Sequence, residues 1–249
     1  MMGLSPILME NVVKKFEDVI AVNGVSLKVA EGELFGLLGP NGAGKTTIVN
    51  ILCGLLKPTS GHVIVGGFDV QEESTRIKEL IGVCPQETAV YPYLTGVENL
   101  ELFGNLYALD RSTLRRRRDM LLEKMGLNQD AKRKVEKYSG GMKRRLSLIM
   151  ALIHDPQIIF LDEPTVGMDP QSRRAVWDFM TELKRENKTI FLTTHYMEEA
   201  EALCNRVGII DHGKLIALNS PRELISKNKV RNLEEVFIKF TGRSIRGEI

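Results

Sequence analysis

The segment from Gly39 to Thr46, which reads GPNGAGKT, constrains this sequence more than any other because it fits G-x-x-x-x-G-K-[ST] at every fixed position. The apolar run Leu34–Leu38 precedes it, and residues suited to a helix follow it as far as Leu52. Such glycines let backbone N–H groups surround a phosphate, and the N-terminus of the helix adds partial positive charge. The alternative is an ordinary glycine-rich turn. Strand, loop and helix together predict a phosphate cradle.

Two side chains of the cradle have distinct expected roles. Lys45 would reach the β- and γ-phosphates of a nucleotide, and the Thr46 hydroxyl would complete the ligand shell of Mg²⁺. The residues expected to bind the nucleotide here are Gly39, Pro40, Asn41, Gly42, Ala43, Gly44, Lys45, Thr46 and Thr47.

Strand patterns predict an α/β fold. Ile7–Val13 and Val25–Val29 are typical of half-buried antiparallel strands. Leu34–Leu38, Ile158–Leu161 and Thr189–Thr194 are continuous apolar runs, which parallel strands covered on both faces require. We therefore expect a P-loop NTPase core, with a mixed, mainly parallel sheet and helices, and an N-terminal antiparallel β subdomain.

A helical insertion is expected within this core. Between Leu94 and Leu152 the apolar residues recur at helical spacing, so we assign an α-helical subdomain to about residues 88–154 of a domain spanning residues 1–221. A short hairpin follows Val207–Ile210, and residues 222–249 form a short C-terminal extension. Its segment Asn232–Gly242 is typical of an amphipathic helix.

Two carboxylates end one of the parallel runs. Asp162 and Glu163 follow Leu161, and the carboxyl end of a parallel strand faces the crevice where α/β sheets bind ligands. We expect Asp162 to hold Mg²⁺, through water, and Glu163 to orient and polarise an attacking water. The alternative is a surface Asp-Glu pair that caps the next helix.

A second anion-binding turn lies inside the insertion. Ser139, Gly140 and Gly141 precede a helix whose apolar residues Leu146, Ile149, Met150 and Ile153 share one face. Taken alone, Ser139 is typical of a plain N-cap. Two copies arranged head to tail could instead bury each nucleotide between the cradle of one chain and the Ser-Gly-Gly turn of the other.

Across almost its whole length the chain resembles the ATP-binding cassette ATPases. Residues 39–47 resemble the Walker A element, and Ile158–Pro164 resemble Walker B. The Ser-Gly-Gly turn resembles the family signature Leu-Ser-Gly-Gly-Gln, with Tyr138 and Met142 in place of the Leu and Gln. The resemblance implies ATP and Mg²⁺ as ligands.

Four more residues match family positions. Gln86 stands where the Q-loop glutamine senses Mg²⁺, and Asp169 belongs to a segment like the D-loop at the dimer seam. His195 resembles the switch histidine that contacts the γ-phosphate, and Phe16 stands where an aromatic stacks on adenine. The implied catalytic set is Glu163, His195, Gln86 and Lys45. Taken alone, Gln86 is typical of a solvated loop and Phe16 of a core.

Composition limits the setting. The net charge of +2 gives no global electrostatic case for nucleic acid, and three scattered cysteines suit a reducing compartment. No run approaches the roughly 20 apolar residues that span a bilayer. We expect a cytoplasmic ATPase, peripheral on the inner face of the membrane, that pairs with itself or a similar ATPase subunit and docks on a separate transmembrane permease.

Two further segments bear on the partner. The run Arg115–Arg118 is typical of a solvated helix face, with lipid headgroups, the partner subunit or nucleic acid as other contacts. The C-terminal segment is similar to the ending of drug- and lipid-exporter ATPases, which favours export. The alternatives are a soluble cassette ATPase acting on ribosomes or DNA, and an ATP-sensing regulatory subunit.

Overall fold

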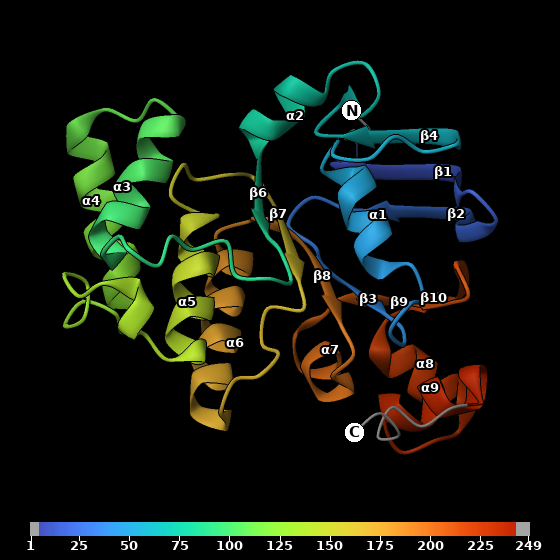
Figure 1. The fold of residues 1–249 in the computed structure, drawn as a ribbon. Helices are drawn as coiled ribbons and strands as arrows, with labels where there is room; N and C mark the ends of the chain where they lie inside the picture. The colour runs from blue at the N-terminus through green and yellow to red at the C-terminus, as the bar shows by residue number, and fades with distance from the viewer. Residues whose placement is uncertain (1–4, 243–249) are drawn as a thin grey trace.

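Two β-sheets organise the chain, with a helix between them and further helices outside (Figure 1). The computed structural model describes residues 5–242. The parts of the predicted domain and C-terminal extension that fall on residues 1–4 and 243–249 lie outside the described residues.

The smaller sheet is antiparallel, as the alternating N-terminal pattern predicts. Its strand order is β2-β1-β4-β5. The strands are β1 (Ile7–Phe16), β2 (Val19–Val29), β4 (Ser60–Val65) and β5 (Phe68–Asp69).

The larger sheet has the order β10-β9-β3-β8-β7-β6, and only the β9–β10 pair is antiparallel. Its strands are β3 (Leu34–Leu38), β6 (Ile81–Cys84), β7 (Ile158–Asp162), β8 (Thr189–Thr194), β9 (Arg206–Asp211) and β10 (Lys214–Asn219). The predicted parallel core and the late hairpin are therefore confirmed.

Both faces of the larger sheet are buried, which explains its uninterrupted apolar runs. Phe35 and Phe160 pack into the core shared with the smaller sheet and with α1 (Lys45–Leu52). Leu38 and Leu161, on the opposite face, pack into a second core with the helices outside. That second layer includes α6 (Pro170–Arg185) and α7 (Met197–Leu203).

The stretch between β6 and β7 is helical, as predicted. It contains α3 (Gly96–Leu106), α4 (Arg111–Lys124), a 3₁₀ turn at Val135–Lys137 and α5 (Gly140–Met150). Figure 1 shows α3 and α4 at one end of the molecule, beyond the edge strand β6, with α5 beside α6. The short α2 (Ser74–Leu80) leads into β6.

The arginine run on α4 is only half solvated, so the prediction of a simple solvent-facing run is wrong for two of its members. Arg115 and Arg116 are exposed. Arg117, 16% exposed, donates to the carbonyls of Leu152 and Ile153. Arg118, 17% exposed, pairs with Glu101 on α3 and with Asp119. The packing of α4 directs Arg117 towards the segment after α5 and Arg118 towards α3. A run of four identical residues does not show which of its members are packed in this way.

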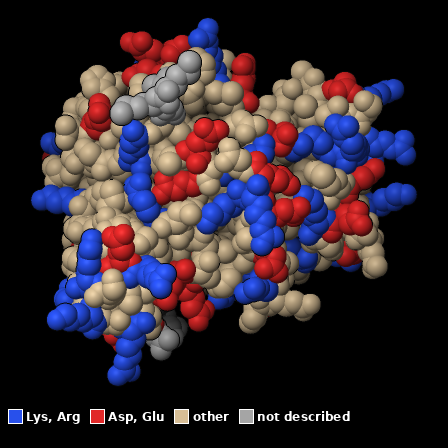
Figure 2. Space-filling model, turned by 180° about the vertical axis from the view of Figure 1, so that it is seen from behind, with Lys and Arg blue, Asp and Glu red and all other residues tan. Residues whose placement is uncertain are grey.

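The C-terminal segment forms two helices, α8 (Pro221–Asn228) and α9 (Leu233–Thr241), which pack near α7. α9 buries Leu233, Val236 and Phe237, in agreement with the predicted amphipathic helix. None of the helices within residues 5–242 combines the length and apolar character needed to cross a bilayer. Seen from behind, Lys and Arg side chains lie among Asp and Glu side chains over the face shown (Figure 2).

Candidate functional site

The predicted phosphate cradle joins β3 to α1, and its backbone requires glycine. Gly44 is the N-cap of α1 with φ 105°, and a Cβ there would lie 2.4 Å from the carbonyl oxygen of Ala21. A Cβ on Gly39 would lie 2.5 Å from the carbonyl oxygen of Ile210. The loop therefore folds tightly against β2 and β9, and this packing fixes its shape.

The cradle opens onto a cavity of about 380 Å³. It is lined by Ala21, Asn41, Gly42, Gly44, Lys45, Thr46, Thr47, Gln86 and Glu163. Residues from four distant parts of the chain therefore meet in one hollow: β2, the loop after β3 with the start of α1, the segment after β6 and the end of β7. The cavity therefore brings together most of the residues predicted for the cradle with Gln86 and Glu163.

Glu163 has the most constrained environment in this cavity. Its φ of 50° is unusual for a residue with a side chain, and its N–H donates to the carbonyl and Oγ1 of Thr193, both at 3.1 Å. Its carboxylate lies 3.2 Å from Lys45 Nζ and 3.1 Å from His195 Nδ1. The left-handed turn after β7 thus directs the carboxylate at Lys45 and His195, the two residues that the implied catalytic set groups with it.

Electrostatics favour the ionised form of Glu163. Burial by itself would raise the pKa of this carboxyl, but the hydrogen bond from His195 and the charge of Lys45 outweigh burial and lower the pKa. An ionised carboxylate at the end of a parallel strand can accept a hydrogen bond from water and polarise it.

Oxygen donors of the kind that Mg²⁺ prefers are present in the cavity wall. The Thr46 hydroxyl and the Gln86 side chain both belong to it. Asp162 is buried, and its Oδ1 accepts a very short hydrogen bond from Thr193 Oγ1. Asp162 is the last residue of β7, directly before Glu163, and unlike Thr46 it does not line the cavity. The set of oxygen donors therefore fits magnesium, with Thr46 at the cavity and Asp162 behind it.

The Ser-Gly-Gly turn is a helix start, and it lies beside Asp169. Ser139 caps α5, its Oγ accepting from Met142 N at 3.2 Å, and Asp169 caps α6, its Oδ1 accepting from Ser172 N at 2.9 Å. A Cβ on Gly141 would lie 4.0 Å from Asp169 Oδ2. Ser139, Gly140 and Asp169 are exposed and do not line the cradle cavity. Within one chain the predicted residues therefore form two separate groups.

Phe16 belongs to neither group. It ends β1, is 44% exposed and carries Lys14 Nζ 4.9 Å from its ring centre. An exposed ring can stack on a base, and the assignment of Phe16 to adenine stays a prediction.

Arg144, which the sequence patterns did not single out, contacts both segments that carry Gln86 and Glu163. Its guanidinium is buried behind the site and bonded to the backbone there. A signal was present: Arg144 shares a helix face with Ser147, Leu148 and Ala151, all of which are buried. Thr193, which holds both Asp162 and the N–H of Glu163, was likewise missed.

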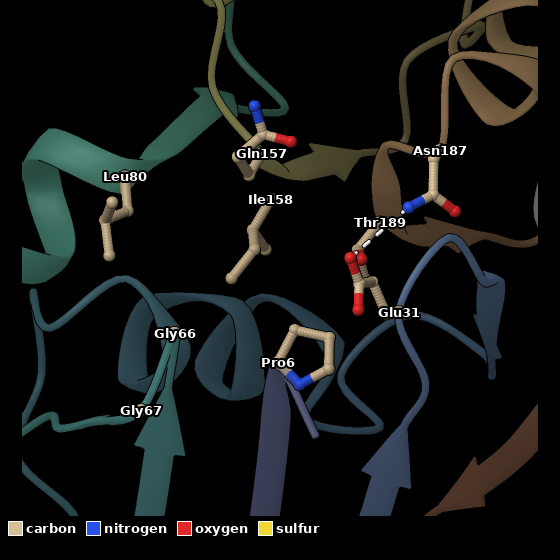
Figure 3. Close-up of a pocket in the computed structure, with 9 residues that line it drawn as sticks. All are labelled: Pro6, Glu31, Gly66, Gly67, Leu80, Gln157, Ile158, Asn187 and Thr189. Carbon is tan, nitrogen blue, oxygen red and sulfur yellow. Dashed lines mark hydrogen bonds between the residues drawn. The ribbon is translucent and has the colours of Figure 1, made fainter. Parts of the chain in front are cut away.

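A second cavity, of about 310 Å³, lies at the opposite edge of the parallel strands (Figure 3). Its lining residues are Pro6, Glu31, Gly66, Gly67, Leu80, Gln157, Ile158, Asn187 and Thr189. Asn187 Nδ2 donates to Glu31 Oε1 at 3.3 Å, and Glu31 is the only ionisable side chain among the nine. This lining has no cation for a phosphate, so the cradle cavity remains the candidate site.

A family model described as ABC transporter matches residues 22–166. The chain is 44% identical over 218 residues to the linearmycin resistance ATP-binding protein of Bacillus subtilis, covering 88% of this chain and 70% of that protein. It is 47% identical over 206 residues to the doxorubicin resistance ATP-binding protein of Mycobacterium tuberculosis, covering 83% of this chain and 62% of that protein.

A solved structure resembles most of the fold. It is a dimeric, post-hydrolysis ATP-binding cassette bound to ADP and Pi, with a TM-score of 0.79 and 28% identity, and the match covers 86% of this chain and 98% of that one. The likeness therefore extends over both the sheet core and the helical insertion.

Proposed function

Because the chain belongs to the ABC transporter family, we propose that it is the ATP-hydrolysing subunit of an exporter and drives a separate membrane-spanning partner. One observation carries the proposal. Lys45, Gln86 and Glu163 line a single cavity with the glycine loop, and His195 holds the Glu163 carboxylate from the other side.

Each of these residues has a distinct task in hydrolysis. The N–H groups of the loop and Lys45 bind the β- and γ-phosphates, which orients the γ-phosphate towards Glu163. Glu163, kept ionised, accepts a hydrogen bond from the attacking water, and His195 fixes the carboxylate and contacts the γ-phosphate. Thr46 and Gln86 would hold Mg²⁺, with Asp162 acting through water, and a bound ion would supply positive charge against the charge that develops on the phosphates.

Dimerisation joins the two groups of residues that one chain keeps apart. Ser139, Gly140 and Asp169 are exposed at the N-termini of α5 and α6, and Gly141 beside them is half-buried. In a head-to-tail dimer this surface covers the triphosphate in the partner's cradle, so each site needs both chains. The solved relative with this fold is dimeric. Loss of the γ-phosphate removes contacts from both chains and releases the dimer.

Export is favoured over the alternatives by the relatives, which are antibiotic-resistance ATP-binding proteins. Closing of the dimer would pull on a permease through the segment from Gln86 to Leu102. The chain then works in the cytoplasm, peripheral on the membrane. A regulatory, non-hydrolytic subunit would not need Glu163 held between Lys45 and His195.

The function is tested by phosphate release from Mg-ATP. Glu163→Gln should slow release by about 10²- to 10⁴-fold and should leave an ATP-bound dimer that is visible by size-exclusion chromatography. Glu79→Gln, at an exposed carboxylate on α2, is the matched control and should behave as the parent chain. If Glu163→Gln hydrolyses ATP at the parent rate, the role proposed for Glu163 in hydrolysis is wrong.

A second measurement separates export from the alternatives. The tagged chain, purified from detergent-solubilised membranes, should bring with it a protein of several apolar spans, and that partner should stimulate hydrolysis. Recovery with ribosomes or DNA, and hydrolysis that is indifferent to membranes, would favour the soluble alternative.

A further inference from the structure

The guanidinium of Arg144, on α5, is the most completely bonded buried cation in the neighbourhood of the site. The residue is 4% exposed. Guanidinium has five N–H groups, and the structure gives Arg144 five backbone carbonyl acceptors. They are Pro164 (3.0 Å, from Nε), Pro85 (2.7 Å) and Gln86 (2.5 Å) from Nη1, and Asp162 (2.7 Å) and Glu163 (2.6 Å) from Nη2.

These five carbonyls belong to two loops that carry the site. Pro85 and Gln86 follow β6, whereas residues 162–164 end β7 and continue past it, and β6 and β7 are adjacent parallel strands. Arg144 therefore holds both loops at the carboxyl edge of the sheet. The backbone of Glu163 is held from two sides, because its N–H donates to Thr193 and its carbonyl accepts from Arg144.

Geometry, more than charge, makes this contact. All five printed partners of Arg144 are carbonyl oxygens, so the planar, five-donor shape of guanidinium is what the two loops match. A lysine keeps the charge but has three N–H groups on a single nitrogen, and it cannot reach both loops with the same set of bonds.

The N-terminus of the same helix carries the turn proposed for the second nucleotide site. α5 begins at Gly140, capped by Ser139, and Arg144 lies about 6 Å further along the axis at 1.5 Å per residue, which is about one turn. One short, rigid piece of helix thus connects the loops around this chain's own nucleotide with the turn that would cover the partner's nucleotide.

Resting on the proposed function, we propose that Arg144 is a positioning residue that couples the two ATP sites of the dimer. Through its five bonds, the placement of Gln86 and Glu163 at one site fixes the placement of the Ser139–Gly141 turn at the other. Removal of one guanidinium then disturbs both sites: its own chain's site through Glu163, and the partner's site through α5.

Arg144→Lys and Arg144→Gln test the coupling, with Arg145→Lys as the matched control. Arg145 is the next residue on α5 and donates to the carbonyl of Met125, inside the insertion and away from the site. Both Arg144 variants should bind Mg-ATP as monomers within about 3-fold of the parent, because Arg144 does not line the cradle. Their kcat should fall about 10-fold or more and their Hill coefficient for ATP should approach 1. Equal losses in Arg145→Lys would overturn the proposal.

Mixed dimers locate the effect. One chain of the dimer carries Glu163→Gln and the other chain is normal. The single working site is then formed by the cradle of the normal chain and the Ser139–Gly141 turn of the Glu163→Gln chain. Adding Arg144→Lys to the Glu163→Gln chain should slow that remaining site about 10-fold, since the altered α5 covers it. Activity equal to that of the dimer with Glu163→Gln alone would overturn the coupling. Arg144→Lys keeps the charge and Arg144→Gln removes it, so the proposal can be tested if either variant folds. ATP affinity shows whether each variant is folded. If the parent dimer itself shows no magnesium-dependent phosphate release, the proposed function fails instead.

Discussion

Nζ of Lys45 lies 3.2 Å from Oε1 of Glu163, so the cation assigned to phosphate and the carboxylate assigned to water are paired with each other. Both side chains are 5% exposed, and Lys45 also donates to the carbonyls of Gly39 and Pro40. The charge of Lys45 contributes to the lowered pKa of Glu163. Phosphate binding and water activation therefore both depend on the Lys45–Glu163 ion pair. A phosphate that draws Lys45 away leaves the carboxylate with its hydrogen bond to His195.

Lys45→Met should weaken Mg-ATP binding about 10- to 100-fold. The reason is the loss of hydrogen bonds between charged groups, each worth roughly 1.5–3 kcal/mol. Isothermal titration calorimetry measures the affinity. Lys78→Met, at an exposed lysine on α2, is the control and should bind as the parent does. Unchanged affinity in Lys45→Met would remove Lys45 from the cradle.

Gly140→Ala and Gly141→Ala should separate folding from dimerisation. Nothing lies within 4 Å of a Cβ on Gly140, and a Cβ on Gly141 would be 3.6 Å from Ser172 Oγ, so both methyl groups fit the single chain. The monomer should keep its melting temperature, whereas the ATP-bound dimer of the Glu163→Gln background should form at least about 10-fold less readily, at a cost near 1.4 kcal/mol. Light scattering measures the dimer. Normal dimerisation would place the turn outside the interface.

Arg117→Ala and Arg116→Ala should differ in stability although the two residues are neighbours. Arg117 donates to Ile153 at 2.6 Å and to Leu152 at 2.8 Å, joining α4 to the segment after α5. Its loss should lower the free energy of unfolding by about 1–3 kcal/mol, because it leaves carbonyls without their donor. Arg116 is exposed, and its loss should change stability by about 0.5 kcal/mol or less. Urea denaturation of the two variants makes the comparison.

His154 should make the fold sensitive to mild acid. Burial lowers its pKa from 6.5 to about 4, while its Nε2 is 3.0 Å from the carbonyl of Ile81 and its ring stacks on Tyr107. A lowered folded-state pKa means that the unfolded chain binds the proton more readily. The contribution of neutral His154 is therefore complete above pH 6.5 and is lost as the pH falls towards 4. It amounts to about 2 kcal/mol or less, because solvent screens this half-buried ring.

His154→Gln isolates this effect, because glutamine can donate to Ile81 and does not titrate. The difference in unfolding free energy between the parent and His154→Gln should fall as the pH is lowered from 7 to 4.5. A difference that is constant over this range would contradict the lowered pKa.

Local patterns were sufficient for the sheet and the cradle. Leu34–Leu38 and Thr189–Thr194 are buried at every position, as strands covered on both faces are, and the loop after Leu38 carries its glycines where the backbone needs them. Residue type, spacing and flanking strands also located Glu163 beside the cradle, since the carboxyl ends of parallel strands share one edge.

Burial of basic side chains was not predictable in the same way. Arg144 and Arg145 are adjacent and chemically identical, yet only Arg144 faces the loops after β6 and β7. Arg117 and Arg118 were likewise hidden within a run of four. Such contacts depend on how α4 and α5 pack against the rest of the fold. Sequence periodicity shows which face of a helix is buried, but it does not show which residues that face contacts.

The order of strands has a consequence for how such chains diversify. β3, which leads into the cradle, lies in the interior of the larger sheet, with β8 and β7 between it and the edge strand β6, beyond which the helical insertion lies. Changes of length or surface in α3 and α4 would leave the strands beside the glycine loop in place. α5, in the same insertion, packs into the core of the larger sheet, and its Arg144 bonds to the loops of Gln86 and Glu163, so sequence change is tolerated less readily there than in α3 and α4.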